Sequence, residues 1–308
     1  MKRIVVVGCL EETLDTLSYL YHLGERIDAL ISLRQEEANI AGISNWIDLQ
    51  PFSVRHQLPL YYVDKYSMNT ESDYKLIKGL NPEAILVIGW QRLLPEKIVE
   101  ISTLGCVGFH GSENLLPWGR GRSPINWSII EGRNRFILHM FFITPGIDDG
   151  DIIGFEIYDI QHEDTCRSVY YKTAIAQARL INRFLPKILE GDCPRYPQIG
   201  EEFHYPKRTP KDGKINWNLP ARDICRLIRA VTHPYPGAFT TISNQTMFIW
   251  RGQYFGDNLL TAHARPGEIV FVSSNNFREI VVQCGQGAIL VSEYDTPILL
   301  QRGDIFDV

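Results

Sequence analysis

Residues 3–33 read RIVVVGCLEETLDTLSYLYHLGERIDALISL, and this stretch sets the fold class. Arg3–Gly8 and Ile27–Leu33 are apolar runs of strand length, and Glu12–Leu23 lies between them. The middle segment carries leucines at helical spacing and stops at Gly24, as helices commonly do. A strand, a helix and a second strand in succession predict a right-handed crossover between two parallel strands.

The same alternation continues along the chain as far as residue 185. Helices are predicted over Asp73–Leu80 and Arg167–Leu185, and strands over Ala84–Gly89, Cys106–His110 and Phe136–Ile143. We therefore expect an α/β domain built on a mostly parallel sheet.

The pattern changes near residue 205. Residues 206–214, PKRTPKDGK, are rich in proline, glycine and charge, as linkers are, and a helix with Pro220 near its start follows. Short strands with turn signals come next, over Ala238–Ile242, Thr246–Arg251, Glu268–Val272, Glu279–Cys284 and Ala288–Glu293. Five short strands predict a small antiparallel barrel. The expected domains are thus 1–205 and 206–308.

Charge and cysteine usage narrow the partners and the compartment. Residues 206–308 hold 11 basic and 9 acidic residues, a net charge of +2, and residues 1–205 hold 20 basic and 27 acidic residues, a net charge of −7. An acidic N-terminal domain argues against a polyanion such as tRNA. The six cysteines form no CxxC pair, the N-terminus does not read as a signal peptide, and no apolar run is long enough for a bilayer. We expect a cytoplasmic protein with no membrane partner and no metal site.

The chemistry is predicted at residues 105–126, GCVGFHGSENLLPWGRGRSPIN. An apolar strand ends at His110, and a second polar cluster, IDDGD (147–151), follows the next strand. In open parallel sheets, ligands bind beyond the carboxyl ends of the strands. A histidine beside a carboxylate is the minimum for acid–base catalysis near neutral pH. Taken alone, His110 could also be a solvated histidine without a catalytic role, and the IDDGD cluster could be only an acidic turn.

Taken together, the motifs resemble those of the 10-formyltetrahydrofolate-dependent formyltransferase family. The resemblance is carried by HGSENLLPWGRGRSPINW (110–127), IDDGD (147–151), RTPKDGKINW (208–217), IRAVTHPYPGAF (228–239) and NQTMFIW (244–250). It runs from about the first strand to about residue 290, and it is stronger toward nucleotide-sugar N-formyltransferases than toward methionyl-tRNA formyltransferase. It implies a Rossmann-like catalytic domain followed by an OB-like barrel, with N10-formyltetrahydrofolate as co-substrate and a homodimer as the expected assembly.

The resemblance also assigns residues. His110 matches the family's catalytic histidine, and Asp148 matches the aspartate that supports it. The residues that match the folate pocket are Arg92, Leu93, Leu94, Arg122, Thr144, Pro145, Gly146, Ile147 and Asp148.

Two departures from the family pattern bear on activity. Glu113 and Asn114 form a two-residue insertion after HGS, and Gly108 stands where the family has an asparagine that donates to the formyl oxygen. Losing one such donor typically costs about 10²–10³ in rate. Asn114, Asn126 or a backbone N–H could replace it, the enzyme could be slow, or the protein could bind folate without transferring formyl.

The sequence therefore predicts formyl transfer from N10-formyltetrahydrofolate to the amine of a nucleotide-linked amino sugar. We expect the nucleotide near Gly8–Glu12 and residues 33–46. Methionyl-tRNA is the alternative acceptor, and a silent folate-binding protein is the alternative that Gly108 raises. A further alternative places the function in the C-terminal barrel, where Trp250 and Tyr254 could stack on single-stranded nucleic acid.

Overall fold

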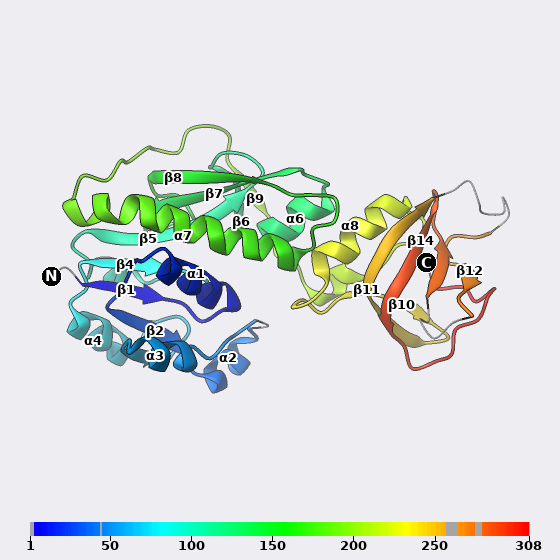
Figure 1. The fold of residues 1–308 in the computed structure, drawn as a ribbon, viewed down its shortest axis with the longest axis horizontal. Coiled ribbons are helices and arrows are strands. Elements are labelled where there is room, and N and C mark those ends of the chain that lie inside the picture. The colour runs from blue at the N-terminus through cyan, green and yellow to red at the C-terminus, as the bar shows by residue number, and fades with distance from the viewer. Residues whose placement is uncertain (1–2, 44, 257–263, 275–278, 308) are drawn as a thin grey trace. The chain divides into compact units, whose positions relative to one another are not determined.

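The computed structural model describes residues 3–43, 45–256, 264–274 and 279–307. Contacts divide the chain into two compact units. The first comprises Met1–Pro124, Arg135–Asp159 and Tyr170–Tyr205, and the second comprises Ile125–Asn134, Ile160–Val169 and Pro206–Val308. Each unit has its own sheet (Figure 1).

The first unit is built on a seven-stranded sheet. In spatial order its strands are β3 (Leu60–Val63), β2 (Ala29–Leu33), β1 (Ile4–Val7), β4 (Ala84–Val87), β5 (Gly105–Ser112), β7 (Arg135–Phe142) and β8 (Ile152–Asp159). The first five are parallel, and β7 and β8 are antiparallel to their neighbours. The order 3-2-1-4-5 is that of a doubly wound sheet, which confirms the predicted Rossmann-like, mostly parallel architecture.

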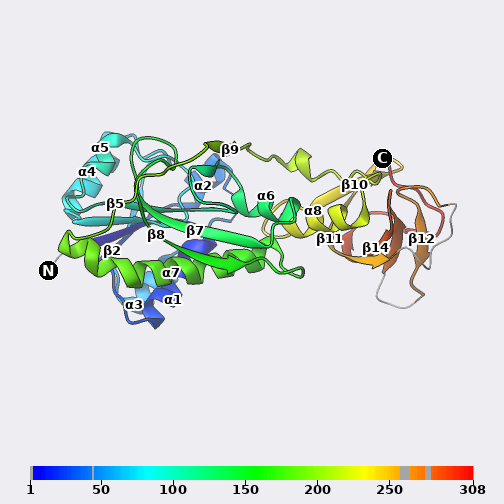
Figure 2. The same ribbon diagram turned by 90° about the horizontal axis from the view of Figure 1, so that it is seen from above.

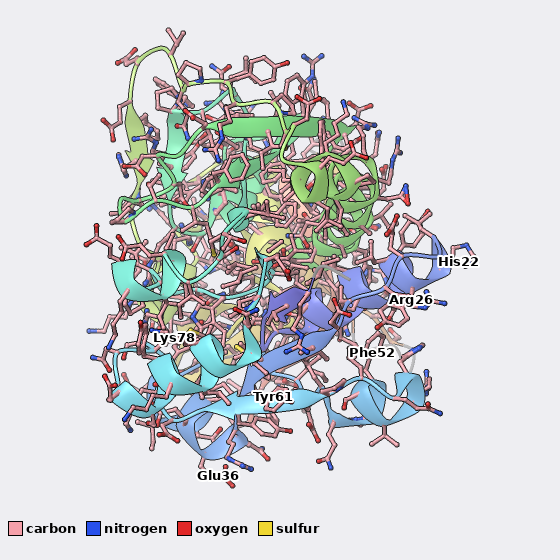
Figure 3. All side chains as sticks on the ribbon, turned by 90° about the vertical axis from the view of Figure 1, so that its left-hand side faces the viewer. His22, Arg26, Glu36, Phe52, Tyr61 and Lys78 are labelled. Atoms are coloured by element: carbon pink, nitrogen blue, oxygen red, sulfur yellow. The ribbon has the colours of Figure 1, made fainter. Side chains whose placement is uncertain are left out.

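Helices cover both faces of this sheet (Figure 2). The core on one face includes Val6, Leu86 and Val107, and it is covered by α1 (Glu11–His22), α3 (Gln50–His56) and α7 (Cys166–Glu190). The core on the other face includes Val5, Val7 and Ile85, and it is covered by α2 (Gln35–Ala41), α4 (Glu71–Leu80) and α5 (Glu96–Val99). Successive side chains of β1 thus enter opposite cores, which is why the strand reads as an unbroken apolar run. Figure 3 shows Phe52 of α3 and Lys78 of α4 on the two sides of the layer.

Local signals explain where the helices begin and end. Glu11 and Glu12 occupy the first turn of α1, where the helix dipole favours negative charge, and Gly24 follows its end with a φ of +91°. Thr70 caps α4 by accepting a hydrogen bond from the Asp73 backbone N–H at 3.1 Å. The boundaries predicted for both helices lie within two residues of those observed.

The edge strand β8 was not predicted from the sequence. It is buried only at its start, and from Gly154 onward its side chains are half-buried or exposed. Short elements such as α2, α3, α5 and β3 were also missed, because four to seven residues carry too little periodicity to be recognised.

The second unit holds a five-stranded antiparallel sheet and one long helix, α8 (Ala221–Val231). Its strands, in spatial order, are β10 (Ala238–Ile242), β11 (Gln245–Gly256), β14 (Ala288–Asp295), β13 (Ile280–Gln283) and β12 (Ile269–Val272). Register shifts bend β11 where it pairs with β14, as strands bend in small barrels. All five strands predicted for this region are present, and Trp217 stacks on Phe306 in the core beneath them.

Candidate active site

His110 projects from the part of β5 that extends beyond its parallel neighbour. Strand β4 pairs with Gly105–Val107, whereas residues 108–112 pair only with β7, where His110 lies opposite His139. Alternation along the strand places Gly108, His110 and Ser112 on one face. The histidine therefore sits at the carboxyl end of the parallel strands, as the sequence predicted.

The structure brings His110 and Asp148 together. Nδ1 of His110 lies 3.4 Å from Oδ2 of Asp148, and Nε2 lies 2.8 Å from the carbonyl oxygen of Gly119. His110 is 8% exposed and Asp148 is 23% exposed, so the pair is sheltered but reachable from solvent. Both ring nitrogens face acceptors. A reacting oxygen that displaced the Gly119 carbonyl from Nε2 would receive a hydrogen bond from the same ring nitrogen.

The loop between β7 and β8 carries Asp148 in a constrained conformation. Asp148 has a φ of +51°, which is unfavourable for a residue with a side chain. A Cβ at Gly150 would come within 1.7 Å of the Phe142 carbonyl oxygen, so this position requires glycine. The side chains of Thr144 and Asp149 are hydrogen-bonded inside the loop. The IDDGD motif is therefore a tight turn that aims one carboxylate at the imidazole.

His139 lies behind the site and is fully buried. Its Nδ1 lies 3.2 Å from the His110 carbonyl oxygen, and the Leu116 backbone N–H donates to its Nε2 at 3.5 Å. These partners require a neutral ring protonated on Nδ1. Burial lowers the pKa of His139 to about 4; the hydrogen bond to the His110 carbonyl raises the pKa in part, and the charge of His110 lowers it by less. His139 therefore fastens the 115–117 segment to β5, a role that the sequence analysis did not assign.

Ile143 occupies the space beside Gly108. A Cβ at position 108 would lie 3.0 Å from both Cγ1 and Cδ1 of Ile143 and 3.5 Å from the Phe141 ring. An asparagine at this position would therefore need Ile143 to move. Of the suggested substitute donors, Asn114 is exposed, and the Asn126 amide in the second unit donates to the Ala230 carbonyl at 2.6 Å.

The residues matched to the folate pocket lie in loops that follow β4, β6 (Trp118–Gly121) and β7. Leu94 is buried, whereas Leu93 and Ile147 are large apolar side chains left 56% and 48% exposed. The guanidinium carbon of Arg92 lies 5.2 Å from the centre of the Tyr66 ring. Burial raises the pKa of the Tyr66 phenol, and the positive charges of Arg92 and Arg122 lower that pKa by less. The remaining four residues, Thr144, Pro145, Gly146 and Asp148, belong to the β7–β8 loop.

The insertion residue Glu113 takes part in a cluster that the sequence analysis missed. Its Oε1 accepts hydrogen bonds from Trp118 Nε1 and from the Tyr205 hydroxyl, each at 2.8 Å. Trp118 stacks on Phe203, because β9 (Phe203–Tyr205) pairs in parallel with β6. Of the two insertion residues, Glu113 is thus held by hydrogen bonds to its neighbours, whereas Asn114 is exposed.

Glu12 lies at the first turn of α1, where we expect the nucleotide. It accepts a hydrogen bond from Gln177 Nε2 at 2.5 Å, and the Gln177 Oε1 accepts from the Thr16 hydroxyl at 2.6 Å. Burial raises the pKa of Glu12 to about 7. A carboxyl group that is partly neutral near physiological pH repels a nearby anionic ligand less than an ionised one would.

Two kinds of feature are absent from the described residues. No helix among them is both long enough and apolar enough to cross a membrane. In the same residues, no three histidine, cysteine, aspartate or glutamate side chains gather where they could hold a metal ion.

A doubly wound sheet with a histidine–carboxylate pair at its strand ends is the framework of an acid–base enzyme, and comparison with known proteins specifies the family. The formyl transferase family model matches residues 36–185, and the model of the formyl transferase C-terminal domain matches residues 207–297. The chain is 36% identical over 218 residues to methionyl-tRNA formyltransferase of Pelotomaculum thermopropionicum. The aligned residues cover 71% of this chain and 67% of that protein. The chain therefore belongs to the formyltransferase family, whose members are enzymes that transfer formyl groups.

The chain is also similar to a second relative and, in fold, to a solved structure. The chain is 32% identical over 263 residues to the bifunctional polymyxin resistance protein ArnA of Wigglesworthia glossinidia brevipalpis. The aligned residues cover 83% of this chain but only 38% of ArnA. The N-formyltransferase from Helicobacter canadensis, solved with folinic acid and dTDP-3-aminofucose, has the same fold, with a TM-score of 0.64 and 14% identity over 96% of this chain and 100% of that one.

We expect Gly108→Ala to destabilise the protein by about 1 kcal/mol, because the new methyl group presses on Ile143. Adding Ile143→Val removes the contacting Cδ1 and should recover at least about 0.5 kcal/mol of that loss. The measurement is the free energy of unfolding in a double-mutant cycle. Gly79→Ala is the control, since a Cβ there meets nothing within 4 Å. Additive effects of the two substitutions would contradict this packing.

We expect His139 to make the protein acid-sensitive. The pKa of His139 is lowered from 6.5 to about 4 on folding, so the unfolded chain binds the extra proton as pH falls through this window. The stability is complete above pH 6.5 and is lost toward pH 4, by about 3 kcal/mol in all. The raised pKa of Glu12 acts in the opposite direction, so wild type must be compared with His139→Gln.

The measurement is the free energy of unfolding at successive pH values from 7 to 4. His139→Gln should be less stable at pH 7 and should show a flatter acid limb than wild type. Parallel curves for the two proteins would show that His139 does not titrate on unfolding.

Proposed function

We propose that this protein transfers a formyl group from N10-formyltetrahydrofolate to the amine of a nucleotide-linked amino sugar. The observation that carries the proposal is the contact between His110 and Asp148, 3.4 Å apart at the carboxyl end of the sheet in a formyltransferase chain. We assign the chemistry to residues 1–205 and an OB-like accessory role to residues 206–308.

The residues present suit the folate co-substrate. Leu93, Leu115 and Ile147 are each about half exposed on three separate loops, and such side chains can cover an apolar ring system. His110 and Asp148 supply the polar groups that a site of this kind needs to orient its ligand. The folate is a substrate that delivers the formyl group.

His110 and Asp148 have distinct roles in the proposed reaction. The acceptor amine forms a bond to the formyl carbon, the bond from that carbon to N10 breaks, and one proton passes from the amine to N10. His110 stabilises the negative charge that develops on the formyl oxygen, and together with Asp148 it relays the proton. Asp148 orients the ring. No covalent bond to the protein is required.

Charge favours a nucleotide-linked sugar as the acceptor. Residues 1–205 carry a net charge of −7, and phosphate contacts to tRNA need a basic surface. A sugar nucleotide presents only a diphosphate, which one or two cations can neutralise. The Helicobacter canadensis protein was solved with a sugar of this class, and its likeness to this chain is one of fold. We also expect the enzyme to work as a homodimer.

Methionyl-tRNA is the second candidate acceptor, because the Pelotomaculum thermopropionicum relative with that name is 36% identical. A silent folate-binding protein is the third candidate, because Gly108 lacks the amide donor of the family. Both are outcomes of the same assay.

The assay incubates the protein with N10-formyltetrahydrofolate and a panel of acceptors, namely nucleotide-linked 3-amino and 4-amino sugars and methionyl-tRNA. We expect a mass gain of one formyl group on a sugar nucleotide. His110→Ala should reduce the rate by about 10²–10⁴, because it removes the charge stabilisation and the proton relay.

His22→Ala is the matched control, because His22 is exposed at the end of α1, away from β5. Its rate should equal that of wild type. Turnover of methionyl-tRNA alone would select the second candidate, and folate binding without turnover would select the third. Full activity of His110→Ala would refute the proposed site.

A further inference from the structure

The segment that follows α7 returns across the catalytic loop. Tyr196 forms a pair of backbone hydrogen bonds with Ile152 at the start of β8, at 2.8 and 2.9 Å. This pairing anchors the segment two residues before Gln198. The side chain of Gln198 consequently lies beside the turn that carries Asp148.

The amide of Gln198 is bonded on both sides. Its Nε2 donates to the carbonyl oxygens of Asp148 at 2.7 Å and Gly150 at 2.9 Å. Its Oε1 accepts from Nε and Nη2 of Arg120 at 3.1 and 2.6 Å. Because Arg120 has only donors, these contacts fix which end of the amide faces the turn.

The turn depends on outside support. Asp148 adopts a left-handed φ of +51°, which most residues avoid. One of the two carbonyls that Gln198 binds belongs to Asp148 itself, so the amide clamps the turn at the residue that faces His110. If the turn relaxed, the carboxylate would move relative to the imidazole, and misplacement by about 1 Å can cost about 10²-fold in rate.

Arg120 is itself held in place. Its side chain is only 11% exposed, and Nη1 donates to Glu202 at 2.9 Å. The two arginines of the GRGR motif thus differ: Arg122 is exposed and is a candidate ligand contact, whereas Arg120 is half-buried and hydrogen-bonded to other residues of the protein.

We propose that Gln198 is a positioning residue, which holds Asp148 against His110 and is itself oriented by Arg120. The inference rests on the proposed function, because its effect is measured on formyl transfer. It adds a residue from an irregular segment, outside the motifs that define the site.

The test is Gln198→Glu. This substitution keeps the shape and the pairing with Arg120, but a carboxylate cannot donate to the two carbonyl oxygens. We expect kcat to fall by about 10- to 100-fold, while KM for the folate and for the sugar nucleotide changes less than about threefold. In an Asp148→Asn background the same substitution should cost less than about threefold, because its effect passes through Asp148.

Gln283→Leu is the matched control. Gln283 also bridges two carbonyl oxygens, those of Cys284 at 2.9 Å and Gly287 at 3.1 Å, but it lies in the second unit. Its loss should lower thermal stability and leave kcat unchanged. An unchanged kcat in Gln198→Glu would overturn the inference, and so would an equal loss of rate with and without Asp148.

A second readout separates this inference from the proposed function. If wild type transfers formyl to no acceptor, the proposed function fails, but the ¹⁵N resonances of the His110 ring still report its contact with Asp148. Gln198→Glu should shift these resonances in the same direction as Asp148→Asn does. Resonances identical to those of wild type would overturn the positioning role.

Discussion

The site depends on one imidazole held between two acceptors. His110 faces the Asp148 carboxylate through Nδ1 and the Gly119 carbonyl through Nε2, at 3.4 and 2.8 Å. Gly119 belongs to β6 and Asp148 to the β7–β8 loop, so the ring keeps its orientation only while both segments keep their positions. Much of the surrounding structure serves this condition: His139 fastens the 115–117 segment to β5, and Gln198 clamps the turn of Asp148.

Elements with strong periodicity were predictable from the sequence. The buried strands β1, β4 and β5 read as apolar runs because both their faces enter a core. Helix α4 ends at its predicted boundary, and α1 ends one residue before its predicted boundary. The pairing of His110 with Asp148 was also predictable. His110 ends the predicted apolar strand of β5, and Asp148 follows that of β7. Because β7 is antiparallel to β5 and ends opposite Val107, the contact is made by the turn after Phe142 and not by two carboxyl ends that meet.

Contacts made by irregular segments were not predictable. Gln198 follows Pro197 in a segment with no periodicity, and its role depends on a backbone pair between Tyr196 and Ile152. The space beside Gly108 is filled by Ile143, a residue that reads as the ordinary end of a strand. The burial of Glu113 against Trp118 and Tyr205 depends on the parallel pairing of β6 with β9, which are four and three residues long.

A crystal structure of the protein with folinic acid and a sugar nucleotide would show whether His110 and Asp148 form the reaction centre. We predict that the folate ring lies against Leu93 and Ile147, with the acceptor amine and His110 both beside N10. Because folinic acid carries its formyl group on N5, the amine should face a free N10, with Asp148 still facing Nδ1 of His110. A folate bound elsewhere, or a His110 ring turned away from Asp148 in the complex, would contradict this prediction.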